Sequence, residues 1–281
     1  MKKGLILEGG AMRCMFSAGI MDVMLENNIE FDGAIGVSAG AAFGCNYKSK
    51  QIGRTLRYNL KYSRDKRYCS FYSLVTTGNL FGAEFCYHEL PEKLDQFDAE
   101  TFAKNPMEFY IVCTDVETAK PVYKKCEDVG YESMEWIRAS ASLPLMAEIV
   151  EIDGMKLMDG GITDTVPLKY FQSIGYEKNI VILTQPKGFV KKKTGFMRLI
   201  KAKLKKYPDF VKAIENRHHM YNDTLAYVKQ QEEKGNVLVL RPEEALPINR
   251  MEKDPKVLQE VYDKGREVGM KYLDEIKEFL E

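Results

Sequence analysis

Two strand–turn–helix units occupy the start of the chain and restrict the folds that it can adopt. The apolar stretch GLIL (4–7) leads through EGGAMR into residues 16–27, whose apolar side chains recur at helical spacing. A second strand, 31–37, leads through GVSAG into the small apolar segment 39–47. Further strands are expected at 108–114, 121–123, 148–152, 179–184 and 236–241. This alternation predicts an α/β fold in which a mainly parallel sheet carries helices on both faces.

The length of 281 residues fits one large α/β domain or two small ones. We expect a single domain, 1–281. Residues 186–235 are basic and contain no convincing strand, whereas 236–241 reads as a return to the sheet. We therefore interpret 186–235 as a helical insertion or flap. From Pro255 onward the spacing of apolar residues predicts a long amphipathic closing helix.

Charge and cysteine content narrow the partners and the compartment. Lys plus Arg and Asp plus Glu both number 41, so no overall field attracts nucleic acid or anionic lipid. The six cysteines and three histidines show no metal-ligand spacing and no disulfide framework, so no metal or cofactor is expected. Scattered free thiols favour a reducing cytoplasm. The basic start MKK resembles a signal peptide, but its apolar stretch stops at Glu8, and no run of 18 apolar residues exists.

Ser38, in the centre of GVSAG, follows a predicted strand and precedes a predicted helix. A serine attacks carbonyl groups efficiently only when it is exposed, held in one conformation and deprotonated. Gly36 and Gly40 allow the strand and the helix to approach each other around a strained turn that presents the hydroxyl. G-x-S-x-G alone is a common chance match, so a base and an oxyanion site are also needed.

Two kinds of base are available to Ser38. His218 or His219 would complete a Ser-His-Asp triad, but neither follows a strand end, and His88 reads as the start of a surface helix. A shielded carboxylate is the other candidate, because burial raises its proton affinity. In LMDGGITDTVPL, Asp159 follows an apolar hairpin, and Gly160 and Gly161 allow an inward turn. An ordinary β-turn explains the same residues.

The loop EGGAMR offers a site for the oxyanion. It lies between a predicted strand and a predicted helix, so the amides of Gly9, Gly10 and Ala11 can converge on one point, and Arg13 can add charge or brace the loop. A dinucleotide or phosphate loop is the alternative. The third glycine of G-x-G-x-x-G is absent, however, and no G-K-[ST] follows.

EGGAMR, GVSAG and DGG together, in this order and spacing, resemble the patatin-like phospholipase family. RASASLPLM (138–146) and TDTVPL (163–168) extend the resemblance, which covers about 4–185 and more weakly 236–265. It implies a three-layer α/β/α fold with a mainly parallel central sheet. It also implies a Ser38–Asp159 dyad, an oxyanion hole at the glycine loop, and hydrolysis of phospholipids or related lipid esters through an acyl-serine intermediate without calcium.

The glycine loop departs from the family pattern GGGxRG at two positions, Ala11 and Cys14. Alanine adopts a positive φ only with strain, so a loop that needs this conformation at position 11 would turn the amide away. The alternative function is therefore a catalytically weak or inactive protein of the same fold that binds lipid or acyl chains.

The segment 187–208 carries nine positive charges and no negative one, with Phe196, Ile200 and Leu204 at helical spacing. Such a helix can lie on an anionic membrane, which would bring Ser38 to lipid; an ordinary surface helix has the same pattern. Nucleic-acid binding is not expected, because no aromatic platform accompanies the charges. Arginines in the region 48–105 either recognise a phosphate headgroup or form a solvated helix face. They are Arg57, Arg64 and Arg67. The oligomeric state is not indicated.

Overall fold

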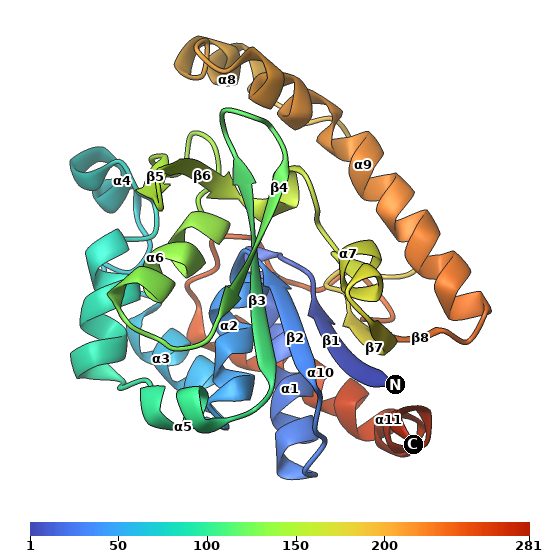
Figure 1. Ribbon diagram of the computed structural model, residues 1–281. Coiled ribbons are helices and arrows are strands. Elements are labelled where there is room, and N and C mark those ends of the chain that lie inside the picture. Colours follow the sequence, from blue (N-terminus) through green and yellow to red (C-terminus); the bar gives the residue numbers. More distant parts are fainter.

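A computed structural model describes all 281 residues and contains one eight-stranded sheet (Figure 1). The strands are β1 (Lys2–Leu7), β2 (Gly33–Val37), β3 (Glu108–Asp115), β4 (Pro121–Cys126), β5 (Val150–Ile152), β6 (Met155–Asp159), β7 (Tyr176–Ile182) and β8 (Val237–Leu240). Their order is β5-β6-β3-β2-β1-β7-β8, with β4 paired to β3 outside this path. A strand exists at each position predicted from the sequence, but several bounds differ by two or three residues: β2 begins at Gly33 and β5 at Val150, two residues later than expected, and β7 begins at Tyr176, three residues earlier.

The sheet has a parallel part and an antiparallel part. β3, β2, β1, β7 and β8 pair in parallel, which confirms the predicted fold class. β4 and β6 pair antiparallel with β3, and β5 with β6. Antiparallel pairing is required where the connection is too short for a crossover helix, as at the two-residue turn Asp153–Gly154. The antiparallel extension carries the end of β6 to the carboxyl end of β3.

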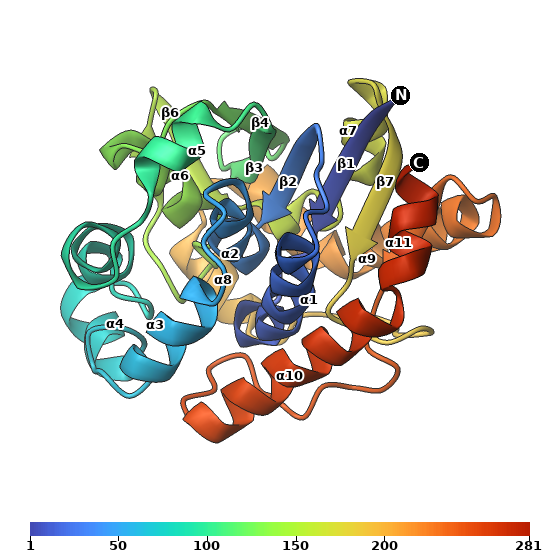
Figure 2. The same ribbon diagram turned by 90° about the horizontal axis from the view of Figure 1, so that it is seen from below.

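Successive side chains of a strand point to opposite faces of the sheet, so they pack into two separate cores. Leu5 and Leu7 join the core under α1 (Met15–Glu26), α2 (Ala39–Lys48), α6 (Tyr131–Ser140) and α10 (Pro255–Lys271). Ile6 instead joins the core under α7 (Leu168–Ser173) and α9 (Pro208–Glu233). Figure 2 shows α1, α2 and α10 together on one side of the sheet. The protein therefore has three layers, α/β/α, as expected.

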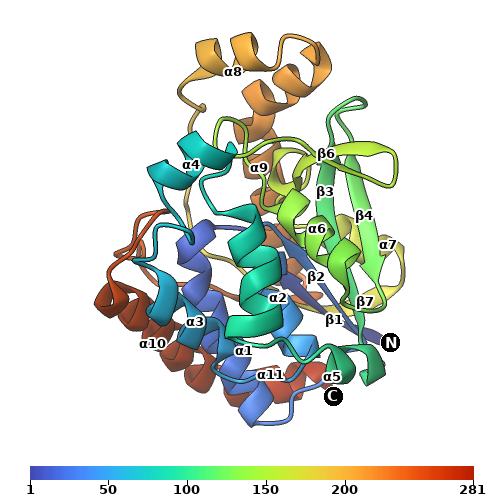
Figure 3. The same cartoon turned by 90° about the vertical axis from the view of Figure 1, so that its left-hand side faces the viewer.

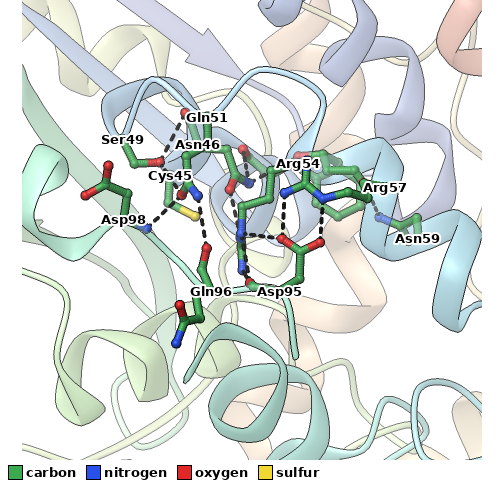
Figure 4. A network of polar contacts seen from close by, with 12 residues as sticks. Cys45, Asn46, Ser49, Gln51, Arg54, Arg57, Asn59, Asp95, Gln96 and Asp98 are labelled. Atoms are coloured by element: carbon green, nitrogen blue, oxygen red, sulfur yellow. Dashed lines mark hydrogen bonds and ion pairs between the residues drawn. The ribbon is translucent and has the colours of Figure 1, made fainter. Parts of the chain in front are cut away.

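The region between α2 and β3 is mostly helical. It contains α3 (Arg54–Tyr62), α4 (Phe71–Thr77), a π-helix (Phe85–Leu94) and α5 (Ala99–Lys104). A polar network joins α2, α3 and the residues after the π-helix (Figure 4). In it, Arg57 Nε lies 2.7 Å from Asp95 Oδ2, and Arg54 Nη1 donates to Asn46 Oδ1 at 2.8 Å.

The arginines considered for headgroup recognition all have acidic partners in the chain. Arg57 pairs with Asp95, Arg64 with Asp254, and Arg67 with Asp65 and Glu89. Their charges are therefore already paired within the protein, Arg64 with the residue that precedes α10.

Two predicted helices are shorter than expected. Within 187–208 only α8, Met197–Lys203, is helical. Ile200 and Leu204 are buried against Phe210, so most of the predicted apolar stripe faces the protein and only Phe196 projects from it. The closing helix is interrupted at Tyr272 and continues as α11 (Leu273–Leu280). Figure 3 shows α8 at one end of the molecule, away from α10.

Candidate active site

Ser38 lies between the carboxyl end of β2 and the first turn of α2. Its backbone has φ 56° and ψ −127°, a strained conformation that is found mainly at functional sites. Gly36 and Gly40 flank it as predicted. A side chain at Gly40 would approach the Leu7 carbonyl oxygen to 2.6 Å, so glycine is needed for α2 to begin this close to β1. The turn leaves Ser38 partly exposed.

Ser140, at the end of α6, holds this turn in place. The Ser38 amide donates to Ser140 Oγ at 2.8 Å, and Ser140 Oγ donates to the Val112 carbonyl at 2.7 Å. Ser140 is fully buried. Ser140 belongs to RASASLPLM, but the sequence predicts no role for it, because its partner lies 102 positions away.

Ser140→Ala is expected to destabilise the protein and to slow any reaction at Ser38. The Ser38 amide and the Val112 carbonyl would lose their shared partner, and an unpaired buried polar group costs about 1–3 kcal/mol. Urea denaturation measures this loss. Ser173→Ala is the matched control, since Ser173 is exposed and bonds only its own helix. An unchanged denaturation midpoint in Ser140→Ala would contradict the bridging role.

Asp159 ends β6, where it pairs with Cys113 of the adjacent β3, and is 1% exposed. One carboxylate oxygen accepts a hydrogen bond from the Gly161 amide at 2.8 Å. Asp159 and Ser38 line the same small cavity. The two residues, 121 positions apart in the chain, are thus brought to one site. Burial raises the pKa of Asp159, while Arg217, the Ser38 side chain and the Gly161 amide oppose the rise.

The glycine loop lies beside Ser38, as expected. A side chain at Gly9 would lie 2.7 Å from the Val37 carbonyl oxygen and 2.9 Å from Ser38 Cβ, so only glycine permits this approach. The amides of Gly9 and Gly10 donate to no protein acceptor. Ala11, the first residue of the 3₁₀ helix Ala11–Cys14, has no intrahelical acceptor for its amide. The loop therefore offers free N–H groups next to the serine.

Ala11 has a φ of 50°, so the loop does need the left-handed conformation at this position, and alanine adopts it. The strain of a non-glycine residue in this region is about 1–2 kcal/mol. Ala11→Gly is therefore expected to raise the free energy of unfolding by about 1 kcal/mol, measured by urea denaturation. Ala42→Gly, in the middle of α2, is the control and should lower the stability. A less stable Ala11→Gly variant would show that the alanine is unstrained.

Basic side chains surround the small cavity over Ser38 and Asp159. The cavity has a volume of about 40 Å³ and is lined by Arg13, Lys191, Arg217 and Arg250, among others. Arg13 was expected here. The other three were missed, because they lie beyond the recognised motifs and only the fold brings them together. Their one visible sign in the sequence was the basic character of 186–235, which includes Lys191 and Arg217.

Glu8 lines this cavity and is fully buried. Its carboxylate accepts hydrogen bonds from the Thr184 amide at 2.5 Å, from the Thr184 hydroxyl at 3.0 Å and from the Tyr221 hydroxyl. Lys191 Nζ lies over the ring of Tyr221, 4.4 Å from its centroid. Glu8 thus joins the ends of β1 and β7 to α9 and holds Tyr221 beneath Lys191.

A second, apolar cavity of about 210 Å³ meets the first one at Ser38. Fifteen of its 17 lining residues are hydrophobic, and the two cavities share Ala11, Ser38, Leu143 and Arg250. Aromatic residues from α2 and the helical region form much of its wall. They include Phe43, Tyr58, Tyr68 and Phe81. The serine hydroxyl therefore lies on the boundary between a polar and an apolar compartment.

The histidines do not reach the Ser38 cavity. His218 and His219 lie on α9, and His218 Nδ1 contacts the Glu215 carbonyl of the same helix at 3.1 Å. His88 is buried within the π-helix, 2.8 Å from Glu135, so its prediction as a surface residue was wrong. His, Cys, Asp and Glu side chains form no group of three that could hold a metal ion. All six cysteines are free.

Comparisons with known proteins found similar families and relatives. A family model described as Patatin-like phospholipase matches residues 5–171. A second, described as Domain of unknown function (DUF6363), matches residues 207–281. The uncharacterized protein YjjU of Escherichia coli is 24% identical over 287 residues, which cover 98% of this chain and 78% of YjjU.

More distant similarities extend to larger proteins. Lysophospholipase NTE1 of Pyricularia oryzae is 25% identical over 185 residues, which cover 62% of this chain but only 11% of that protein. Among solved structures, VipD from Legionella pneumophila matches with a TM-score of 0.47 and 13% identity, covering 98% of this chain and 67% of VipD.

Proposed function

Because the chain belongs to the patatin-like phospholipase family, we propose that it is a lipid acyl hydrolase in which Ser38 and Asp159 form a catalytic dyad. The observation that carries the proposal is the placement of Ser38 and the buried carboxylate of Asp159 in one small cavity, with Ser38 also lining an apolar cavity. Burial gives a carboxylate the proton affinity that a general base needs. The apolar cavity has the character of an acyl-chain site.

In the first half of the proposed reaction, Ser38 Oγ attacks the ester carbonyl carbon and its proton passes to Asp159. The tetrahedral intermediate then collapses, the bond to the alcohol oxygen breaks, and the alcohol leaves with the proton from Asp159. In the second half, Asp159 takes a proton from water, and the water oxygen attacks the acyl-serine. The acid leaves, and the proton returns to Ser38. Ester and water are thus converted into alcohol and acid with no other reactant.

The glycine loop is the proposed oxyanion hole. Gly9, Gly10 and Ala11 line the same cavity as Ser38, and the amides of Gly9 and Gly10 have no acceptor in the protein, so we assign them the negative charge of the tetrahedral intermediate. Arg13 braces the loop, since its Nε lies 3.4 Å from Thr184 Oγ1. Gly160 and Gly161 support the dyad by turning the chain after β6, so that the Gly161 amide orients the Asp159 carboxylate.

We further propose that residues 1–281 work as one domain, with 186–235 as an insertion between β7 and β8. Three features support this: β8 pairs with β7, α10 packs on α1, and the insertion supplies Lys191 and Arg217 to the Ser38 cavity. The proposed compartment is the reducing cytoplasm, on the basis of six unpaired cysteines.

Two assays test the proposed function. The first is a series of acyl esters of graded chain length, and the second is labelling of the native protein with a fluorophosphonate, which reacts with activated serines. Hydrolysis together with labelling at Ser38 supports the enzyme. Binding of fatty acid without hydrolysis or labelling would overturn it in favour of the alternative, a lipid-binding protein with a silent serine.

Membrane contact through residues 187–208 is a further part of this proposal. No helix of the protein is both long and apolar enough to cross a bilayer. The segment does expose Phe196 (77%) and Leu199 (58%) among lysines, most of which are free of acidic partners. Apolar side chains flanked by basic ones bind anionic membrane surfaces.

The double change Phe196→Ser plus Leu199→Ser is expected to weaken binding to phosphatidylserine vesicles at least about tenfold, since each apolar side chain contributes about 1.5–3 kcal/mol when fully buried. Cosedimentation with vesicles measures the effect. Met270→Ser is the matched control, because Met270 is 56% exposed but lies on α10 (Figure 2). Equal binding by all three proteins would contradict membrane contact at this segment.

A further inference from the structure

Four basic side chains converge on the Ser38 cavity from three separate parts of the chain. Arg13 belongs to the glycine loop, Lys191 and Arg217 to the insertion, and Arg250 to the loop between β8 and α10. Arg217 and Arg250 lie within 207–281, the region whose family model has no described function. That region therefore contributes directly to the proposed active site.

None of these four cations has an acidic partner within 4.0 Å, whereas the arginines of the helical region are all paired. Arg13 uses only its Nε in a hydrogen bond, to Thr184, and Arg217 uses only its Nε, to the Gly161 carbonyl at 2.5 Å. Neither Arg250 nor the Lys191 ammonium donates a hydrogen bond to the protein. The terminal guanidinium nitrogens therefore remain available for a ligand.

The carboxylates in the cavity are outnumbered by the basic groups. Only Glu8 and Asp159 line it beside the four basic residues. Glu8 accepts hydrogen bonds from Thr184 and Tyr221, and Asp159 from Gly161, and neither carboxylate pairs directly with a basic residue. Burial, followed by the neighbouring Arg217 and Arg250, lowers the pKa of Lys191 to about 7. Concentrated positive charge with free donors is the arrangement that binds phosphate or carboxylate groups.

Each of the two cavities that meet at Ser38 suits one half of an ester. The apolar cavity is suited to the acyl chain, so the alcohol half must lie on the side of the basic residues. The volume of about 40 Å³ on that side has room for roughly three water-sized groups, which suits a compact oxyanion. An apolar cavity of 150 Å³ holds benzene, so one of 210 Å³ suggests an acyl chain of about eight carbons.

Resting on the proposed function, we propose that Arg13, Lys191, Arg217 and Arg250 form an anion subsite that binds a phosphate or carboxylate on the alcohol half of a single-chain ester. The preferred substrate is then an anionic monoacyl ester rather than a neutral one. Region 207–281 acts as the part of the protein that selects this charge. If the four basic residues only stabilised the oxyanion of the tetrahedral intermediate, they would instead accelerate the hydrolysis of all esters equally.

The test compares two esters with the same acyl chain, 1-octanoyl-glycerol and 1-octanoyl-glycerol 3-phosphate. The ratio of their kcat/KM values, phosphate ester over neutral ester, is the readout. We expect a ratio well above one in the wild type, and a fall of about 10-fold to 100-fold in Arg250→Gln and in Lys191→Gln, because a hydrogen bond to a charged group contributes about 1.5–3 kcal/mol. Arg250→Lys should retain part of the preference.

Lys192→Gln is the matched control, since Lys192 is the exposed neighbour of Lys191 and does not line the cavity. It should leave the ratio unchanged. A ratio that stays the same in Arg250→Gln and Lys191→Gln, or losses that are equal for both esters, would overturn the anion subsite. Inorganic phosphate distinguishes the source of the anion: if it inhibits hydrolysis of the neutral ester competitively in the wild type, the subsite binds the free anion as well as the headgroup.

A failure of the proposed function can be distinguished from a failure of the anion subsite. If the wild type hydrolyses neither ester, the enzyme proposal fails, and calorimetric titration of both esters into the wild type and Arg250→Gln still tests the subsite. Tighter binding of the phosphate ester by the wild type, reduced in Arg250→Gln, would support it. Equal binding of both esters would contradict it without reference to catalysis.

Discussion

Replacing Ser38 with alanine is expected to lower ester hydrolysis by about 10⁶-fold, the loss found when a serine hydrolase loses its nucleophile. The variant cannot form an acyl-serine, so fluorophosphonate labelling should disappear as well. The fold should survive, because alanine occupies the same strained backbone position with the same Cβ and the Ser38 amide still has its partner in Ser140.

The matched control for this change is Ser173→Ala, which removes an exposed hydroxyl far along the chain from the site. Its rate and labelling should equal those of the wild type. Melting curves of both variants establish that each protein is folded. Persistent hydrolysis in a folded Ser38→Ala protein would show that another group attacks the ester.

Replacing Asp159 with asparagine is expected to lower kcat/KM by about 10⁴-fold, the upper part of the range for loss of a general base. Asparagine fills the same space beside Gly161 but cannot accept the proton of Ser38. Asp164→Asn is the matched control. Asp164 is a half-buried aspartate in the same segment, with a pKa raised to about 6 by burial, but it accepts a hydrogen bond from Tyr123 and does not line the cavity.

The dyad and the histidine triad predict opposite results. A double change of His218 and His219 to alanine should leave hydrolysis within a few-fold of the wild type, because neither side chain lines the cavity. Should the double variant lose activity while Asp159→Asn keeps it, the base is a histidine and the dyad is wrong.

The raised pKa of Asp159 also sets the direction of two pH dependences. As a base, Asp159 must be ionised, so kcat/KM should rise with pH through its folded-state pKa and then level off. Stability changes the other way. A carboxyl whose pKa is higher in the folded state contributes stability below its unfolded pKa, near 3.9, and loses it as pH rises through the folded value. Asp159→Asn should therefore be at least as stable as the wild type at pH 8, measured by urea denaturation.

The local parts of the site could be predicted from sequence because each is a short run with its own geometry. GVSAG predicts a turn at a strand end, and EGGAMR predicts free amides between a strand and a helix. The structure places both as expected. The placement of Ser38 and Asp159 in one cavity was predicted only from the joint resemblance to a family, since no periodicity connects residues so far apart.

Helix predictions failed where tertiary contacts outweighed apolar spacing. The stripe of 187–208 predicted one helix, yet Ile200 and Leu204 are drawn into the core with Phe210, and only Met197–Lys203 is helical. The sequence predicted a surface position for His88, whereas in the structure Glu135 and Tyr131 pack against it. Packing against distant elements decided both cases.

The amino-acid sequence by itself determined the strands, the serine turn and the glycine loop, because strand period, glycine and small side chains act within a few residues. Only the tertiary structure decided which charges meet at Ser38. Arg13, Lys191, Arg217 and Arg250 are spread over most of the chain, and their convergence depends on the order of β1, β7 and β8 in the sheet. Charged residues that are far apart in the sequence become neighbours through the topology of the sheet, and this topology depends on the packing of the whole chain.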